Sequence, residues 1–398
     1  MTPKRFMLIA GETSGDVLAA ELVAELRAAL QRQQTYSTDV QPLRSGLAPR
    51  FFGAGGPRMA AAGVEMEIHL TQHSMVGIPG VKDFLKFKRF RDQLFALALE
   101  RQPHAIICVD FNLFNLRFAA FVKNYIRARH GTFNNWNPKV IKYISPQVWA
   151  SRENRAYQMA RDFDLLLSIF PFEKDWYAAR VPQLPVEFVG HPMMDRYQGF
   201  VSGAPIADAG PLIVLLPGSR SKELKRHLPP MFGALKIIQA TVPHLRARMI
   251  LPSPALMELA AQFSPPPGLK VRCGGLSESL AEADVAIAST GTVTMECAYF
   301  GVPAVTLYKT SPLEFEIGKR IVKVKSLTMP NLLAGEPVFP EFIQNAATPE
   351  SLANAALELL RNPARREKVR AQLKQVVASL GGPGASRRAA EAILRILP

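Results

Sequence analysis

The sequence predicts an α/β protein of two doubly wound, Rossmann-like domains that face each other across a cleft. Short apolar segments of strand length alternate with segments in which apolar residues recur at helical spacing. A stretch of small residues without periodicity, 198–210, separates a first series of these segments from a second. The length of 398 residues also fits two or three domains. Ligands of such sheets bind beyond the carboxyl ends of the strands, so the loops after strands are where we expect a site.

The first series begins with an apolar run from Phe6 to Ala10, which predicts a strand. The turn 11–16 follows, and a helical pattern then carries apolar residues every four positions, at Leu18, Leu22, Leu26 and Leu30. The other apolar runs that predict strands in this half are 105–109, 140–144, 165–170 and 186–189. Strands that alternate with helices pair in parallel, so these runs predict one parallel sheet.

The second series repeats this arrangement. Its predicted strands are 212–216, 248–251, 285–288 and 304–307, and the chain is predicted to be helical from about Pro349 onward. The predicted organisation is an N-terminal domain of residues 1–200, a C-terminal domain of residues 201–365, and C-terminal helices, 366–398, that pack back across the domains.

The composition favours an anionic partner and gives no indication of a metal site. Lys and Arg number 48 against 33 Asp and Glu, and a net charge of +15 favours nucleic acid, anionic lipid or a phosphorylated small molecule. The three cysteines form no CxxC pair, which excludes a disulfide framework and fits a reducing compartment. His69 and His73 have i, i+4 spacing without an HExxH motif, so two surface histidines are the better interpretation. No segment reaches the roughly 18–20 apolar residues of a membrane-spanning helix.

Two glycine-containing loops, 11–16 and 217–220, follow predicted strands and precede helices, where backbone N–H groups favour anions. The first loop lacks the GxGxxG spacing of a dinucleotide site, so taken alone it is better explained as a tight turn. The second loop adds a guanidinium that suits a diphosphate, although a solvated arginine explains it equally well. The candidate residues of these loops are Glu12, Ser14, Gly15, Gly218, Ser219 and Arg220.

A third loop of this kind contains Thr290, Gly291 and Thr292 and precedes a helix that carries Glu296. A carboxylate one turn into such a helix can accept hydrogen bonds from ribose hydroxyls, although a lone glutamate is more often an ordinary helix residue. Asp110 ends the apolar run 105–109, where it can act as a general base, and a cap for the following helix is its slightly favoured alternative role.

The segment 81–95 interleaves phenylalanine and leucine with lysine and arginine. Lys82, Lys86 and Arg89 fall on one helical stripe, with Phe84 and Phe87 between them. This mixture suits a helix that lies on anionic lipid, although a core-packed helix with a basic solvated face is the commoner arrangement. The net charge favours lipid contact.

Segments along most of the chain resemble those of the lipid-A-disaccharide synthase family, whose members are glycosyltransferases of the GT-B fold. The motifs that carry the resemblance are AGETSGD (10–16), GAGGPRM (53–59), YISPQVWA (143–150), FPFEKDWY (170–177), PVEFVGHPMMD (185–195), LLPGSR (215–220), TGTVTMECAYFGVP (290–303) and MPNLLAG (329–335). Their order and spacing are specific to the family and go beyond the fold.

The resemblance implies a reaction and a location. UDP-2,3-diacylglucosamine donates its sugar to 2,3-diacylglucosamine 1-phosphate with inversion, which gives a β-1,6-linked disaccharide 1-phosphate and UDP without a metal or other cofactor. The C-terminal domain would hold the UDP-sugar and the N-terminal domain the phosphorylated acyl-sugar. The protein would be cytoplasmic and peripheral on the inner face of the inner membrane, and association into a homodimer is left open.

The resemblance also implies roles for single residues. Asp110 would be the general base for the acceptor 6-hydroxyl, and Arg220 would stabilise the charge on the departing diphosphate. The residues implied at the nucleotide are Gly218, Ser219, Arg220, Thr290, Gly291, Thr292, Glu296 and Asn331, and those implied to line the cleft from the N-terminal domain are Glu12, Ser14 and Gly15.

The chain departs from the family pattern in its N-terminal half. Leu113 stands where the family has a second aspartate, Gly80 where it has glutamate, and Ser151 where it has tryptophan. A different lipid acceptor therefore remains an alternative, as does another UDP-sugar enzyme of the same fold, such as a UDP-N-acetylglucosamine 2-epimerase. A nucleic-acid-binding protein is suggested by charge alone, and no reader motif supports it. A catalytically silent scaffold is disfavoured by the retained Asp110 and Arg220.

Overall fold

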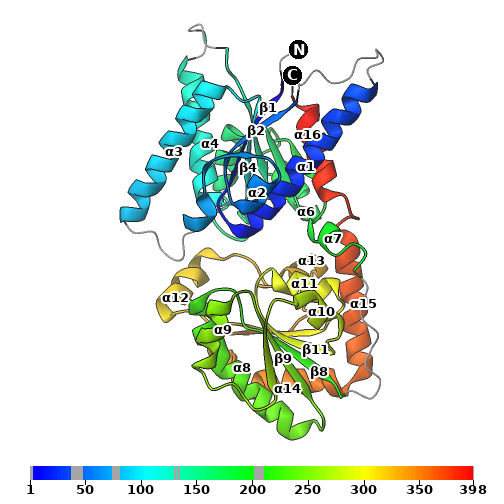
Figure 1. The fold of residues 1–398 in the computed structure, drawn as a ribbon. Helices are drawn as coiled ribbons and strands as arrows, with labels where there is room; N and C mark the ends of the chain where they lie inside the picture. Colours follow the sequence, from blue (N-terminus) through cyan, green and yellow to red (C-terminus); the bar gives the residue numbers. More distant parts are fainter. Residues whose placement is uncertain are drawn as a thin grey trace. The chain divides into compact units, whose positions relative to one another are not determined.

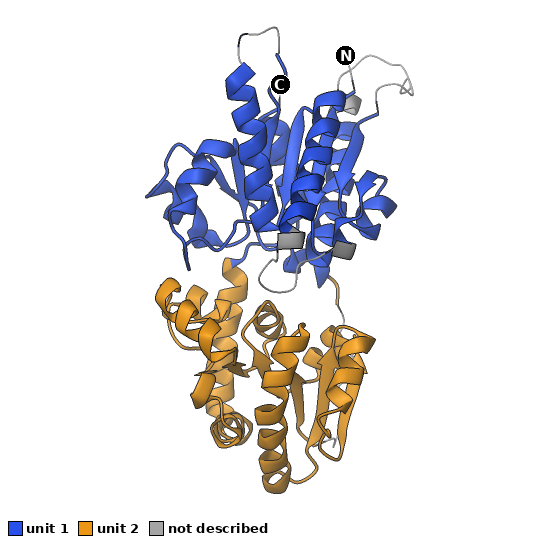
Figure 2. Cartoon of the chain, turned by 90° about the vertical axis from the view of Figure 1, so that its left-hand side faces the viewer, with its two compact units in different colours: residues 1–198, 380–398 blue, residues 199–379 orange. Residues whose placement is uncertain are grey.

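A computed structural model describes residues 3–36, 48–73, 81–129, 131, 135–200 and 210–397. The chain forms two compact units (Figure 2). Unit 1 consists of Met1–Gln198 and Leu380–Pro398, and unit 2 consists of Gly199–Ser379. Of the predicted linker, residues 201–209 lie outside the described residues.

Unit 1 contains a seven-stranded parallel sheet with the order β3-β2-β1-β4-β5-β6-β7. Its strands are β1 (Arg5–Ala10), β2 (Arg50–Ala54), β3 (Glu65–Ile68), β4 (Ala105–Val109), β5 (Lys139–Tyr143), β6 (Leu165–Ser168) and β7 (Val186–Phe188). Its helices are α1 (Thr13–Tyr36), α2 (Pro57–Ala61), η1 (Leu70–His73), α3 (Val81–Arg101), α4 (Asn112–Arg129), α5 (Arg155–Asp162), α6 (Pro171–Ala178), α7 (Met193–Arg196) and α16 (Ala385–Arg395). Helices α1 and α16 cover one face of the sheet and α3 and α4 cover the other (Figure 1).

Unit 2 contains a six-stranded parallel sheet with the order β10-β9-β8-β11-β12-β13. Its strands are β8 (Leu212–Leu216), β9 (Arg246–Leu251), β10 (Leu269–Cys273), β11 (Val285–Ser289), β12 (Ala304–Tyr308) and β13 (Glu341–Ile343). Its helices are α8 (Ser221–Thr241), α9 (Pro254–Ala261), α10 (Leu276–Ala281), α11 (Val293–Tyr299), α12 (Pro312–Ile321), α13 (Met329–Ala334), η2 (Gln344–Ala346), α14 (Pro349–Arg361) and α15 (Pro363–Ser379).

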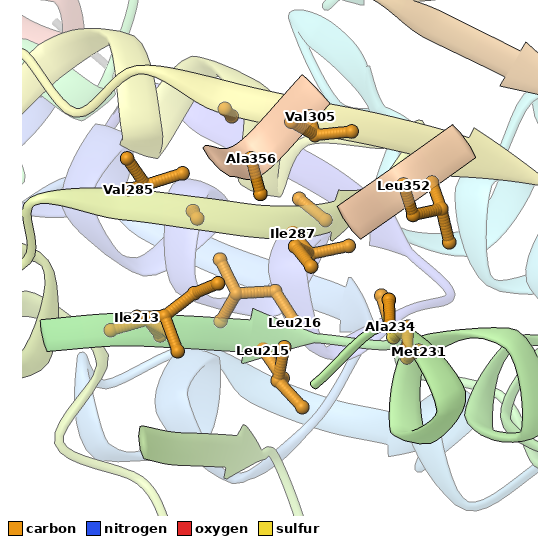
Figure 3. Packing of buried hydrophobic residues seen from close by; sticks show 14 of the residues in the cluster. Ile213, Leu215, Leu216, Met231, Ala234, Val285, Ile287, Val305, Leu352 and Ala356 are labelled. Carbon is orange, nitrogen blue, oxygen red and sulfur yellow. The ribbon is translucent and has the colours of Figure 1, made fainter. Parts of the chain in front are cut away.

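Each sheet is held by its own apolar core. In unit 2, α8 and α14 lie side by side, and Met231 and Leu352 belong to the same apolar cluster as Ile213 and Ile287 of the central strands (Figure 3). The strands β8 and β11 are buried along their whole length. Near-continuous apolar runs are the pattern expected of strands covered on both faces, which is why these runs predicted strands correctly.

The C-terminal helix α16 belongs to unit 1, where it packs against α1. The Asp195 carboxylate accepts hydrogen bonds from the backbone N–H groups of Gly384 and Ala385 at the start of α16. The Arg388 guanidinium donates to the carbonyl oxygen of Val189 over 2.7 Å. The motif at 185–195 therefore anchors the returning end of the chain.

Candidate functional site

Both sheets reverse their strand order at one place, and most of the predicted site residues lie there. The reversal falls between β1 and β4 in unit 1 and between β8 and β11 in unit 2. The loop 11–16 follows β1 and Asp110 follows β4, whereas the loop 217–220 follows β8 and residues 290–292 follow β11. Ligands of doubly wound sheets bind at this reversal, so the structure brings these loops together in each unit, whereas Asn331 lies on α13.

The turn that carries Asp110 is strained and firmly held. Asp110 and Phe111 have φ angles of 43° and 44°, a left-handed conformation that costs roughly 1–2 kcal/mol for each non-glycine residue. The Asn115 side-chain amide donates to the carbonyl oxygens of Val109 and Asp110, at 3.2 and 2.8 Å. The Asp110 backbone N–H donates to the Tyr143 carbonyl oxygen over 3.0 Å. Surrounding contacts that fix a strained turn are typical of functional sites.

The loop 11–16 lies against this turn. A Cβ atom at Gly15 would be 3.6 Å from the Cβ of Asp110, and a Cβ at Gly11 would be 2.3 Å from the Phe111 ring. The close approach of the two loops therefore requires glycine at position 11. Glu12 and Ser14 are exposed. Within the described part of the chain, no hydrogen bond engages the Asp110 carboxylate, which leaves its oxygens available to a substrate proton.

Asp16 joins two of the sequence motifs. Its buried carboxylate accepts hydrogen bonds from the backbone N–H groups of Gly56, Arg58 and Met59, at 2.8, 2.9 and 3.1 Å. These groups lie at the start of α2, so Asp16 fixes the motif at 53–59 beside the loop 11–16. We interpret Asp16 as a structural residue.

Lys142 is a further residue at the unit 1 site, and it is not among the residues predicted from the sequence. It lies on β5, is fully buried, and donates through Nζ to the carbonyl oxygen of Asp110. Burial lowers the pKa of Lys142 to about 8, and the Asp110 charge opposes part of that shift. A lysine inside the apolar run at 140–144, next to the strand that ends at Asp110, is the signal that could have found it.

An apolar pocket with basic residues lies between α3 and α4, with a volume of about 260 Å³. Its lining residues are Phe84, Phe87, Lys88, Arg91, Leu113, Phe114 and Arg117. The ring centroid of Phe87 is 5.9 Å from that of Phe111, so the pocket adjoins the Asp110 turn. Leu113 contributes an apolar side chain to the α4 wall of this pocket.

In unit 2, the loop 217–220 leads directly into α8. Gly218 has a φ of 117°, and a Cβ atom there would be 2.6 Å from Oε2 of Glu223. The Arg220 side chain is 65% exposed and its Nη1 lies 3.1 Å from Glu223 Oε1. A pair this exposed contributes little to stability, so the guanidinium can exchange its carboxylate partner for a phosphate.

His227 holds the loop 217–220 in place through a hydrogen bond to Pro217. It is fully buried, its Nδ1 lies 2.7 Å from the Pro217 carbonyl oxygen, and its Nε2 accepts from the Lys309 N–H over 3.0 Å. Because Nε2 accepts, the neutral ring carries its proton on Nδ1 and donates it to Pro217. Burial lowers the pKa of His227, which favours this neutral form.

The remaining predicted residues of unit 2 fall into two groups. Thr290 follows β11, Gly291 and Thr292 are exposed just before α11, and Glu296 is half-buried on that helix. Thr294 donates through Oγ1 to the Gly291 carbonyl oxygen over 2.7 Å, which shapes this loop.

Asn331 has a different environment. Its amide nitrogen donates to the Phe339 carbonyl oxygen and to Glu341 Oε1, at 2.8 and 2.9 Å. Its oxygen accepts from the backbone N–H groups of Val338 and Phe339, at 2.9 and 2.8 Å. These contacts use both amide hydrogens of Asn331. Asn331 can therefore affect a nucleotide only indirectly, by positioning the segment 338–341.

The side chains of the described residues form no group of three or more His, Cys, Asp or Glu that could hold a metal ion. His69 is exposed and follows the end of β3, whereas the side chain of His73 lies outside the described residues. None of the helices in the described ranges is long and apolar enough to cross a membrane.

Sequence and structure comparisons relate the chain to known proteins. Residues 6–396 match the family model described as lipid-A-disaccharide synthetase. The lipid-A-disaccharide synthase of Geobacter metallireducens is 35% identical over 403 residues, which cover 99% of this chain and 97% of that protein. The glycosyltransferase of kitacinnamycin is similar in structure, with a TM-score of 0.62, 18% identity and full coverage of both chains. The UDP-GlcNAc 2-epimerase of Neisseria meningitidis, solved with UDP-GlcNAc, has a TM-score of 0.56 at 10% identity and covers 99% of this chain and 100% of that chain.

At these identities the two solved structures show the fold alone. They confirm the predicted fold class, the two-domain α/β architecture of GT-B proteins. The full-length sequence matches favour the synthase reading over the epimerase.

Proposed function

The chain belongs to the lipid-A-disaccharide synthase family. From this we propose that the site in unit 2 binds the sugar donor and the site in unit 1 binds the acceptor. The chain is a glycosyltransferase that joins UDP-2,3-diacylglucosamine to 2,3-diacylglucosamine 1-phosphate. We assign the UDP portion of the donor to the loops after β8 and β11, and the acceptor to the site around Asp110. The observation that carries this assignment is that both groups of residues lie where the strand order reverses.

The proposed chemistry is an inverting displacement. Asp110 accepts the proton of the acceptor 6-hydroxyl while that oxygen forms a bond to C1 of the donor sugar. The bond between C1 and the diphosphate oxygen breaks on the opposite face, and its electron pair leaves with UDP. Arg220 and the N–H groups at the start of α8 stabilise the charge that develops on the diphosphate.

The nucleotide contacts follow from the loop geometry. Gly218 and Ser219 bring the backbone close to the diphosphate, and residues 290–292 present a second exposed loop from the neighbouring strand. Glu296 accepts hydrogen bonds from the ribose, and Asn331 supports the site through its segment. Glu12, Ser14 and Gly15 bound the acceptor beside Asp110.

The acceptor's acyl chains fit the pocket between α3 and α4. The pocket is lined by phenylalanines and Leu113, and Lys88, Arg91 and Arg117 add positive charge that suits a sugar phosphate. The outer surface of α3 also combines apolar and basic side chains. Phe84 and Leu85 are 54% and 59% exposed, and they lie beside exposed lysines and Arg89. We propose that residues 81–95 rest on an anionic membrane surface, at the inner face of the inner membrane.

The reaction is tested by a transfer assay. Purified protein, both acyl-sugar substrates, detergent and EDTA should yield disaccharide 1-phosphate and UDP in equal amounts. UDP release without disaccharide would contradict the proposed acceptor. Formation of neither product, by protein that binds UDP, would contradict the reaction itself.

The lipid contact is tested separately by sedimentation with vesicles of phosphatidylcholine and phosphatidylglycerol. Replacing both Phe84 and Leu85 with serine should weaken partitioning about tenfold or more, since burial of each such side chain contributes about 1.5–3 kcal/mol. The matched control is Tyr157→Ser, because Tyr157 is also 59% exposed in unit 1 but lies on α5. Equal partitioning of the double variant and the wild type would exclude α3 as the contact.

A further inference from the structure

We propose that Lys142 is a positioning residue for Asp110: its buried ammonium fastens the strained turn that presents the Asp110 carboxylate for the proton transfer. This inference rests on the proposed role of Asp110 as the general base. Three observations carry it: the burial of the lysine, its hydrogen bond and the charges around it.

A fully buried lysine requires a compensating contact. Lys142 has none of its surface exposed, and removing an ammonium from water is costly unless it is paired. Its Nζ donates to the Asp110 carbonyl oxygen, from β5 to the end of the neighbouring strand β4. The buried Lys142 ammonium therefore lies where it can hydrogen-bond to the strained Asp110 turn.

The contact completes a set of hydrogen bonds around that turn. Asn115 donates to the same Asp110 carbonyl oxygen, and the Asp110 N–H donates to Tyr143, the residue after Lys142. The left-handed φ angles of Asp110 and Phe111 would relax to ordinary values if these contacts were lost. Lys142 thereby fixes the direction in which the Asp110 side chain leaves the backbone.

Two ionisable groups influence the charge of Lys142. They are Cys108 on β4 and Asp110, which follows that strand. Burial raises the pKa of Cys108 to about 12, so its thiol stays neutral. Leu166 on β6 pairs with Lys142, and Asn115 on α4 donates to the same Asp110 carbonyl oxygen as Lys142; neither side chain ionises. The negative charge of Asp110 therefore favours the ammonium form of Lys142.

The sign of the pH effect follows from this pairing. The charged form of Lys142 holds the turn, and burial brings its pKa down to about 8. The value of kcat/KM should therefore fall as pH rises through about 8 in the wild type. Lys142→Met should lose that alkaline decline, lower kcat at pH 7 at least about tenfold, and leave the KM for the UDP-sugar within about twofold.

The matched control is Lys139→Met, at the opposite end of the same strand, which should keep the wild-type rate and pH profile. The proposal is overturned if Lys142→Met loses no more rate than Lys139→Met, or if the wild-type kcat/KM stays constant from pH 7 to 10. The second outcome needs no variant, so it holds even if Lys142→Met fails to fold.

A titration independent of turnover separates this inference from the proposed function. NMR of the full chain with labelled lysine side chains should show one lysine with a midpoint near pH 8, which disappears in Lys142→Met or Lys142→Arg. Asp110→Asn should move this midpoint to lower pH by at least about half a unit, because loss of the opposite charge disfavours the ammonium. An unchanged midpoint overturns the pairing. If the wild type forms no disaccharide, the proposed function fails, and this titration alone decides the role of Lys142.

Discussion

Replacing Asp110 with asparagine should lower kcat about 10³-fold or more and leave UDP binding within about twofold. The amide occupies the space of the carboxylate but cannot accept the proton of the attacking hydroxyl, and general bases contribute about 10²–10⁴-fold. UDP binding is unaffected because its proposed contacts lie in unit 2, whereas Asp110 lies in unit 1. Initial rates of disaccharide formation and calorimetric UDP binding measure the two quantities.

Asp175→Asn is the matched control for this variant. Asp175 is an exposed carboxylate on α6 of the same unit, and its loss should leave both quantities unchanged. Turnover of Asp110→Asn within a few-fold of the wild type would remove Asp110 from the proton transfer. Another base would then have to be sought around the pocket and the loop 11–16.

Replacing Arg220 with alanine should lower kcat about 10²–10³-fold, the usual effect of losing one donor to a developing negative charge. The exposed Arg220 guanidinium lies at the start of α8 beside a half-buried partner, Glu223, which it can leave for the diphosphate. Arg220→Lys should recover only part of the rate, because an ammonium keeps the charge but not the two-pronged hydrogen bonding of arginine. Steady-state kinetics with a varied UDP-sugar concentration separate the effects on kcat and KM.

The control for the Arg220 variants is Lys236→Ala, which removes an exposed positive charge from a later turn of the same helix. It should leave kcat and KM unchanged. Kinetics of Arg220→Ala that match this control would place the diphosphate away from the loop 217–220.

The central strands of both sheets could be predicted because burial on both faces gives them continuous apolar sequences. Residues 105–109 and 212–216 form strands at the predicted bounds. The strands that the sequence analysis missed were β2, β3, β10 and β13. β3 and β10 alternate charged with apolar residues, β13 has three residues, and β2 contains Gly53 at a φ of 144°. Their pairing partners stabilise them more than their own sequences do.

The predicted site residues could be grouped from sequence because parallel strands bring their carboxyl ends to one edge. The supporting residues could not be found in this way. Lys142 interrupts an apolar run, which marks it as unusual but does not indicate its partner, and no motif in the sequence marks His227. Only the structure shows that the lysine contacts the Asp110 turn and that the histidine links Pro217 to Lys309. The roles of the predicted site residues stay predictions until the variants are measured.

The return of α16 to unit 1 has a consequence for the order in which the protein folds. Unit 2 is formed by an uninterrupted segment, whereas unit 1 needs both ends of the chain. During synthesis on the ribosome, unit 2 therefore has all its residues before unit 1 does. The surface of α1 that α16 covers can be covered only after α16 has been synthesised, and Asp195 gains the N–H groups of Gly384 and Ala385 at the same stage. N-terminal domains usually complete their folding first, but here unit 2 can be complete before unit 1.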